Sequence, residues 1–201
     1  FYIRAPKASQ AKEIFARDQD VARGAAIMTG TTMDFAIKSG MTDLFNNDVL
    51  GKVCEEAWTE VGPTQFSEKA YEVAKLLAPA VGNPAAEKVL NTDVPKYVRI
   101  PIAMPGSTDV GDVSYVVPTV MMMYAAESIG TPGHSWKITA QAACGIGHKG
   151  MLYAAKVMAL TGIIALDKPE KLKEAYDEYV KLTGGKYICP VGPEVKAQYQ
   201  D

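Results

Sequence analysis

Two kinds of side chain in this sequence are suited to metal binding or catalysis, and the first is histidine. His134 lies in a loop rich in glycine and proline, soon after an apolar segment, where α/β proteins place their functional sites. A neutral imidazole there can bind a metal ion or exchange a proton near neutral pH, with an ordinary surface histidine as the alternative. The second histidine, His148, comes at the expected start of a helix, which favours a structural role.

The second kind is charged residues beside apolar segments. Arg4 lies on one face of an expected strand that is otherwise rich in aromatic residues. The planar guanidinium matches a substrate carboxylate, and the alternative is a surface salt bridge. Asp109 and Asp112 lie in a turn rich in glycine and serine, where acids usually accept hydrogen bonds from local backbone amides. The same turn could line a substrate pocket.

Three glycines have the spacing of a dinucleotide-binding loop: Gly145, Gly147 and Gly150. Such a loop needs a preceding strand, and an acid at the tip of a following strand. Residues 137–143 would make at best a short strand, and Asp167 is expected at the far end of the same helix. Close helix packing is therefore the favoured interpretation, with NAD binding as the alternative.

The composition of the 201-residue chain limits the classes of function. Lys and Arg together number 21 against 23 Asp and Glu, and the net charge of -2 argues against a dedicated nucleic-acid-binding protein. The isolated cysteines Cys54, Cys144 and Cys189 are typical of reduced thiols in a cytoplasmic protein. The chain begins at Phe1 without an initiator Met or a signal peptide, so we expect a piece of a longer protein.

Residues 1–40 are expected to form a first domain. Alternating apolar residues predict strands over residues 1–4 and 31–38, on either side of a helix that Ser9 caps and Gly30 ends. The alternation in the second strand indicates an antiparallel sheet with one exposed face. Such a β-α-β unit is too small to be stable alone, and its open sheet edge favours dimerisation.

Residues 41–201 predict an α/β domain. Helices are expected after Asn47, after Ser67, over residues 151–166, and from Asp167 to a stop at Gly184. The unbroken apolar run at residues 116–126 is typical of a central strand that is covered on both faces. Because Lys156 interrupts residues 151–166, which fall short of about 20 apolar residues, we expect a buried core helix and no membrane span.

Several stretches together resemble one family: FYIRAPKASQ, MTGTT, GSTDVGDVSYVVPT, GTPGHSW, GHKGM and GGKYICP. They extend over essentially the whole chain and are similar to the p-aminobenzoyl-glutamate hydrolase branch of the two-metal amidohydrolases, a family that includes carboxypeptidase G. The resemblance implies that residues 1–40 are the second half of a ferredoxin-like lid or dimerisation domain. It implies that residues 41–201 are the second half of a zinc-peptidase-like α/β catalytic domain.

The resemblance also implies roles for individual residues. His134 matches the last metal ligand, and Arg4 matches the lid arginine that grips the substrate carboxylate, commonly at the active site of the partner subunit. The other substrate-binding matches are Gly106, Asp109 and Gly111 in one turn, and Gly130 and Gly133 in the loop that presents the ligand histidine. The implied activity is that of a homodimer which uses zinc or manganese to cleave the amide bond of N-acyl amino acids such as p-aminobenzoyl-glutamate.

Most of the ligands for such a reaction have no counterpart in this chain. A hydrolytic site needs about three protein ligands per ion, and the two histidines here lie in unlike contexts. No general base is apparent beside His134, so we assign no catalytic residue. We expect the remaining ligands in a missing N-terminal half, and no activity from this chain alone. The alternatives are a NAD-binding domain and a non-enzymatic dimerisation module.

Overall fold

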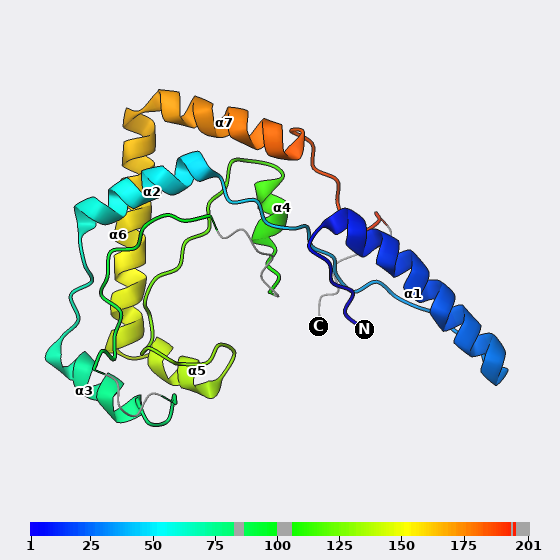
Figure 1. Ribbon diagram of the computed structural model, residues 1–201, viewed down its shortest axis with the longest axis horizontal. Coiled ribbons are helices and arrows are strands. Elements are labelled where there is room, and N and C mark those ends of the chain that lie inside the picture. The colour runs from blue at the N-terminus through cyan, green and yellow to red at the C-terminus, as the bar shows by residue number, and fades with distance from the viewer. Residues whose placement is uncertain (83–86, 100–105, 194, 196–201) are drawn as a thin grey trace. The chain divides into compact units, whose positions relative to one another are not determined.

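The computed structural model describes residues 1–82, 87–99, 106–193 and 195, which form helices joined by extended segments (Figure 1). The helices are α1 (Ala8–Thr29), α2 (Asp48–Val61), α3 (Glu68–Leu77), α4 (Val110–Ser114), α5 (Trp136–Ala142), α6 (Gly145–Asp167) and α7 (Pro169–Thr183). The chain divides into two compact units. Unit 1 comprises Phe1–Asn47, Arg99–Val120 and Tyr176–Asp201, and unit 2 comprises Asp48–Val98 and Met121–Ala175.

The main core of unit 2 lies between α2 and α6. Apolar residues recur along α2 every three to four positions, so that one face of this helix is hydrophobic. That face packs on α6, and the buried residues are Val53, Ala57, Trp58, Tyr153, Val157, Ile164 and Ala165. The hydroxyl of Tyr153 also donates a hydrogen bond of 2.7 Å to the carbonyl oxygen of Gly62, directly after α2. Burial of apolar surface is therefore the main interaction that holds these two helices together.

A second cluster in unit 2 joins α3 to the start of α6. Its buried members include Ala70 and Ala74 on α3, Leu90 from an extended segment, and Ile146 near the start of α6. A β-carbon at Gly150 would collide with the backbone of the segment that contains Ala125, so this glycine lets α6 approach that segment closely.

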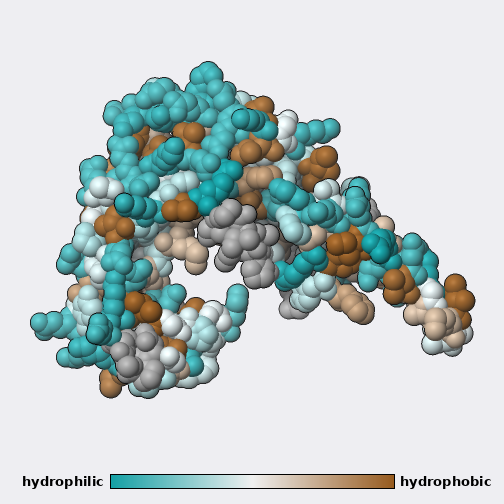
Figure 2. All heavy atoms as spheres, viewed as in Figure 1, coloured by the Kyte–Doolittle hydropathy of each residue, from teal (hydrophilic) through white to brown (hydrophobic). Residues whose placement is uncertain are grey.

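Unit 1 contains much less buried apolar surface. Its long helix α1 has no buried residue, although the ring of Phe15 contacts that of Phe35 edge-on at 5.8 Å between centroids. Apolar side chains remain exposed along α1, as the brown spheres over this helix show in Figure 2; they include Ile14, Val21, Ile27 and Met28. Polar contacts, described below, therefore hold much of unit 1 together.

The prediction of an α/β fold with a β-α-β unit is wrong for the described residues, which form helices and no sheet. Residues 1–4, 31–38 and 116–126 are extended or irregular instead of being strands, and one isolated antiparallel bridge joins Leu90 to Ser128. Alternation fixes which side chains share a face, but a strand is stabilised only by hydrogen bonds to a neighbouring strand. The described segments offer one another no such ladder, and Phe1 and Met123 are largely exposed.

Three predictions of helix ends that rest on local chemistry are confirmed. Gly30 ends α1 with a positive φ of 65°, and Gly184 follows α7 with a φ of 72°. At α3, the Ser67 side chain accepts a hydrogen bond from the N–H of Ala70, as an N-cap residue does. The prediction for Ser9 is wrong, because α1 begins at Ala8 and the residue before it is Lys7. The predicted start of the last helix at Asp167 is also wrong, because Asp167 ends α6 and α7 begins at Pro169.

Helix α6 is buried on one face only, so the prediction of a buried core helix over residues 151–166 holds for that face alone. Side chains on its other face are more than half exposed, namely Met151, Leu152, Met158, Ile163 and Leu166. Within the described part of the chain, α6 is the helix whose length and composition would suffice to cross a membrane. The core helix of a soluble protein meets the same criterion, so this is weak evidence for a membrane span.

Candidate functional site

Two of the predicted substrate-binding elements meet within unit 1, although they lie 103 residues apart in the sequence. The guanidinium Nη1 of Arg4 donates a hydrogen bond of 3.3 Å to the Oγ of Ser107, in the turn at residues 106–111. The contact is exposed, so both groups can be reached from solvent. The structure therefore brings Arg4 to the turn that contains Gly106, Asp109 and Gly111.

The turn at residues 106–111 is held by hydrogen bonds of its own. The backbone N–H groups of Gly111 and Val110 donate to the carbonyl oxygen and the hydroxyl of Thr108, at 3.1 Å and 3.3 Å. Asp109 lies at the N-cap of α4 but makes no capping hydrogen bond with its side chain. Its carboxylate is exposed and accepts instead from the Thr108 hydroxyl at 3.5 Å. A substrate-binding role for Asp109 stays a prediction.

Helix α4 packs closely against residues 42–45. A β-carbon at Gly111 would collide with the backbone of Thr42, so only glycine permits this approach. The hydroxyl of Ser114 donates to the carbonyl oxygen of Gly111 at 2.6 Å and accepts from the N–H of Phe45 at 3.1 Å. This buried serine therefore fixes the end of α4 to the segment at residues 42–45.

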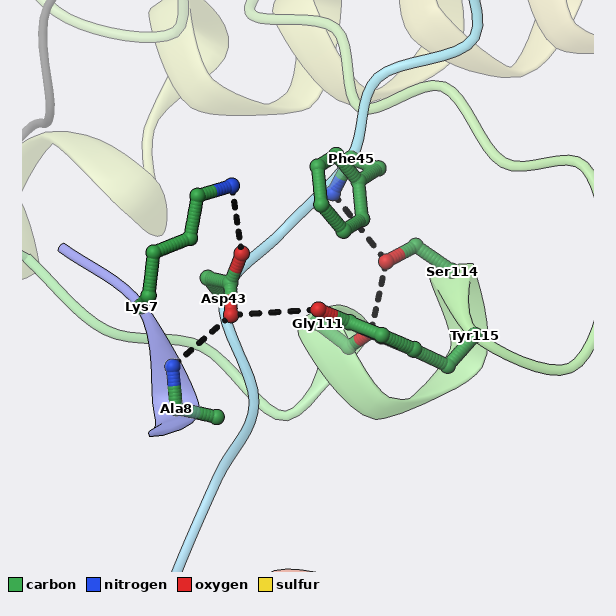
Figure 3. A network of polar contacts seen from close by, with 7 residues as sticks. All are labelled: Lys7, Ala8, Asp43, Phe45, Gly111, Ser114 and Tyr115. Atoms are coloured by element: carbon green, nitrogen blue, oxygen red, sulfur yellow. Dashed lines mark hydrogen bonds and ion pairs between the residues drawn. The ribbon is translucent and has the colours of Figure 1, made fainter. Parts of the chain in front are cut away.

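The carboxylate of Asp43 is the centre of the polar network in Figure 3. Its Oδ1 accepts from the N–H of Ala8 at 3.0 Å and from the hydroxyl of Tyr115 at 3.2 Å, and its Oδ2 accepts from Lys7 Nζ at 3.2 Å. Burial alone would raise the pKa of Asp43, but the Ala8 amide and the Lys7 ammonium together hold this pKa below its ordinary value. Asp43 is therefore a carboxylate that its neighbours keep ionised.

A second carboxylate, that of Asp112 on α4, accepts from the hydroxyls of Thr42 at 3.2 Å and Tyr187 at 3.1 Å. Tyr115 lies near both acids. Burial, together with the charges of Asp43 and Asp112, raises the pKa of Tyr115 to about 12. This tyrosine therefore keeps its proton at neutral pH and acts as a hydrogen-bond donor.

Sequence reasoning missed several residues of these polar contacts, among them Ser107, Asp43 and Tyr115. Ser107 lies inside the GSTDVGDVS motif, so the resemblance could have pointed to it. Tyr115 also lies inside the longer motif GSTDVGDVSYVVPT, whereas Asp43 follows no motif or spacing rule. Two partners of Asp43, Ala8 and Tyr115, lie 35 and 72 residues from it in the chain. No local signal identifies such contacts.

The loop that contains His134 lies in unit 2 and has an unusual backbone. His134 is the one residue other than glycine with a positive φ in the described part of the chain, at 53°, and Gly130 has a φ of 89°. Buried Gln141 anchors the loop, because its Oε1 accepts from the N–H of Ser128 at 2.7 Å and its Nε2 donates to Thr131 Oγ1 at 3.0 Å. The loop conformation is thus fixed, with the His134 side chain exposed.

An open pocket of about 270 Å³ borders this loop within unit 2. It is lined by Asn91, Met123, Tyr124, Ala125, Glu127, Ser128, Ile129, Gly130 and Thr131. The predicted residue Gly130 is among them, whereas Gly133 and His134 are not. Substrate binding by Gly130 and Gly133 and metal binding by His134 stay predictions.

The described residues do not fit a complete metal centre. Nowhere among them do three His, Cys, Asp or Glu side chains gather in a way that could hold an ion. Since a hydrolytic ion needs about three protein ligands, His134 could supply at most one of them. The remainder of such a centre would have to come from residues beyond those described.

Packing accounts for two of the glycines that resemble a dinucleotide-binding loop. A β-carbon at Gly147 would collide with the backbone of Ala142, and one at Gly150 with that of Ala125. The segment before them is helix α5 and not a short strand. The strand that a dinucleotide site requires is therefore not found at this place.

Comparison with known proteins confirms the resemblance stated from the motifs. The chain is 29% identical to a subunit of the p-aminobenzoyl-glutamate hydrolase of Escherichia coli (strain K12), over 97% of this chain and 46% of that protein. It is 28% identical to a mouse (Mus musculus) Xaa-Arg dipeptidase, over 89% of this chain and 35% of that protein. It is 26% identical to the human (Homo sapiens) Xaa-Arg dipeptidase, over 95% of this chain and 37% of that protein.

The chain thus spans between about a third and a half of the length of these relatives. No family profile matches the chain. No solved structure matches it either. What these comparisons support is a likeness to hydrolases of the aminoacylase and peptidase type.

Proposed function

We propose that this chain forms the carboxylate-binding part of a metal-dependent amidohydrolase, which cleaves the amide bond of N-acyl amino acids such as p-aminobenzoyl-glutamate. The observation that carries the proposal is the contact of 3.3 Å between Arg4 Nη1 and Ser107 Oγ, because it joins two motifs to which the resemblance gives a substrate-binding role. The names of the related proteins, a hydrolase subunit and two dipeptidases, support the same class of reaction.

The chemistry of this contact suits an amino-acid carboxylate. A guanidinium offers several N–H donors in a fixed plane, and charge-assisted hydrogen bonds to a carboxylate are about twice as strong as neutral ones. The Ser107 hydroxyl accepts from Arg4 through a lone pair, so its own O–H can donate one more hydrogen bond to the ligand. Both groups are solvent-exposed, so a small ligand reaches them without a rearrangement of the core.

We also propose that His134 supplies one ligand of the divalent metal ion, zinc or manganese, and that the other ligands lie outside the described residues. The exposed position of His134 on an anchored loop is consistent with this role. On this proposal the 201-residue chain alone has no hydrolytic activity and requires a further part of the protein, corresponding to the N-terminal half of the relatives.

The test is glutamate release from p-aminobenzoyl-glutamate by the protein expressed from its complete native gene, with added zinc or manganese. His134→Ala should abolish release while the circular dichroism spectrum is retained. His148→Ala is the matched control, because this second histidine is expected to have a structural role, and it should keep most of the activity. Near-normal kcat for His134→Ala, or hydrolysis by the 201-residue chain alone, would contradict the proposal.

Arg4 is tested separately, by its effect on substrate binding. Arg4→Ala should raise KM for p-aminobenzoyl-glutamate by about tenfold or more, because a charge-assisted pair is lost. Arg17→Ala on α1 is the control, since Arg17 is a cation in unit 1 to which no substrate role is assigned. An unchanged KM for Arg4→Ala would make Arg4 an ordinary surface residue.

A homodimer formed through residues 1–40 is a second proposal, and the exposed apolar side chains of α1 support it. Val21, Ile27 and Met28 are each more than 70% exposed, which is unusual for three apolar residues on one helix. A concentration series by light scattering tests the proposal: a monomer at all concentrations would contradict it. Val21→Lys should weaken the dimer, whereas Lys12→Glu changes charge without removing apolar surface.

A further inference from the structure

A single carboxylate joins the two segments that bring Arg4 and Ser107 together. On one side, Asp43 binds Lys7 and the N–H of Ala8, which follow Arg4 closely in the chain. On the other side it accepts from Tyr115, the residue directly after α4. From this arrangement we infer that Asp43 is a positioning residue, which holds Arg4 against the turn at residues 106–111. The inference rests on the proposed role of Arg4 in substrate binding.

Asp43 acts on the Arg4 side by capping α1. The first N–H groups of a helix have no partner within the helix and are usually bound by the side chain at the N-cap. The N-cap residue of α1 is Lys7, whose side chain has no oxygen and makes no capping bond. The carboxylate of Asp43 takes this place from 35 residues away, and its negative charge also suits a helix N-terminus. The position of Arg4 therefore depends on Asp43.

Helix α4, which follows the turn at residues 106–111, is held to residues 42–45 by further contacts that do not involve the Asp43 carboxylate. Ser114 accepts from the N–H of Phe45, Asp112 accepts from the hydroxyl of Thr42, and Gly111 packs on the same backbone. Loss of the Asp43 carboxylate should therefore leave α4 in place and release the start of α1. On the Arg4 side, a cation–π contact of 4.4 Å from Lys7 Nζ to the ring of Phe45 would remain.

The first measurement follows local structure and does not depend on the enzymatic activity. Amide hydrogen exchange in residues 4–11 should be about tenfold faster in Asp43→Ala than in the wild type, because the capping and ionic contacts are both lost. Exchange in residues 110–116 should change far less. Asp43→Asn keeps an oxygen for Ala8 but loses the charge. Its exchange rate in residues 4–11 should therefore lie between those of the wild type and Asp43→Ala. Asp20→Asn is the control, because its partner Arg23 is on the exposed surface of α1.

The second measurement uses the intact protein and follows substrate binding. Asp43→Ala should raise KM for p-aminobenzoyl-glutamate by about tenfold with a nearly unchanged kcat, and Asp43→Asn should restore part of the loss. In the Arg4→Ala background, Asp43→Ala should raise KM no further, because the group it positions is already absent. A merely structural role would instead reduce kcat and lower the melting temperature in both backgrounds.

The two measurements separate the possible failures. If the wild type hydrolyses no N-acyl amino acid, the proposed function fails, while faster exchange confined to residues 4–11 still supports the positioning role. If exchange in residues 4–11 is unchanged in Asp43→Ala, the positioning role is overturned whatever the activity. Equal acceleration in residues 110–116, or additive effects of Arg4→Ala and Asp43→Ala on KM, would also overturn it.

Discussion

The two units of this protein are held together by different interactions. Among the described residues, almost every buried hydrophobic side chain belongs to unit 2, and Tyr179 is the exception in unit 1. Unit 1 instead buries Thr42, Asn47 and Ser114, and it ties its segments to the carboxylates of Asp43 and Asp112. The candidate carboxylate-binding contact lies in the polar unit, and the loop of the candidate metal ligand lies in the apolar one.

This difference predicts how each unit responds to change. Apolar burial is proportional to area and independent of charge, so unit 2 should be sensitive to the volume of its core side chains and insensitive to pH. Directional hydrogen bonds to charged groups depend on geometry and ionisation, so unit 1 should be sensitive to both. The polar contacts of unit 1 suit the proposed role of Arg4, because they can fix a cation in position and still leave it open to solvent.

The largest effect is expected in the core of unit 2. Trp58 is 4% exposed and contacts Tyr124 edge-on, so Trp58→Ala should lower the free energy of unfolding by about 3–5 kcal/mol. Trp136→Ala is the matched control, because Trp136 is 67% exposed, and it should change this energy by less than about 0.5 kcal/mol. Urea unfolding followed by circular dichroism measures both. Equal costs for the two variants would mean that the α2–α6 contact is not the core of unit 2.

A smaller effect is expected for backbone packing in unit 1. Gly111→Ala should lower the free energy of unfolding by about 1–3 kcal/mol, because the added β-carbon collides with the backbone at Thr42. Gly106→Ala, in the same turn, has open space around its β-carbon and should cost little. Urea unfolding compares the two. If both glycines tolerate alanine equally, α4 does not pack against residues 42–45 as described.

The comparison also explains which parts of the fold the sequence could predict. The ends of α1, α3 and α7 depend on one or two neighbouring residues, and Gly30, Ser67 and Gly184 predicted them correctly. The absence of a sheet from the described part of the chain was not predictable in this way, because alternation at residues 31–38 and the apolar run at 116–126 describe side chains alone. Whether such segments pair depends on backbone partners that are distant in sequence.

The same distinction between local and long-range information applies to the candidate site. Arg4, the turn at residues 106–111 and His134 were predicted as site residues from motifs, because these motifs resemble those of a known family. The contact between Arg4 and Ser107 and the central position of Asp43 were not found, since the partners lie 103 and 35 residues apart. Long-range polar contacts of this kind leave no periodic trace in a sequence.

The pH dependence of stability is a weaker but more specific test of the polar unit. Because the pKa of Asp43 lies below its ordinary value of 3.8 in the folded protein, its contacts stabilise the fold above that pH. This stabilisation is lost as the pH falls through the lowered pKa. Asp43→Asn cannot ionise, so the difference in unfolding free energy between wild type and variant should narrow as the pH falls from neutral through this range. A constant difference would show that the charge of Asp43 contributes nothing.

The smallest effect separates a predicted cap from an observed one. The sequence marks both Ser9 and Ser67 as helix caps, but only Ser67 accepts a hydrogen bond from the helix it precedes. Ser67→Ala should therefore cost about 1 kcal/mol of unfolding free energy. Ser9 lies inside α1, where alanine is the better helix former, so Ser9→Ala should be neutral or stabilise by less than about 0.5 kcal/mol. Urea unfolding of both variants decides the matter: a cost for Ser9→Ala equal to that of Ser67→Ala would mean that Ser9, and not the distant carboxylate of Asp43, caps α1.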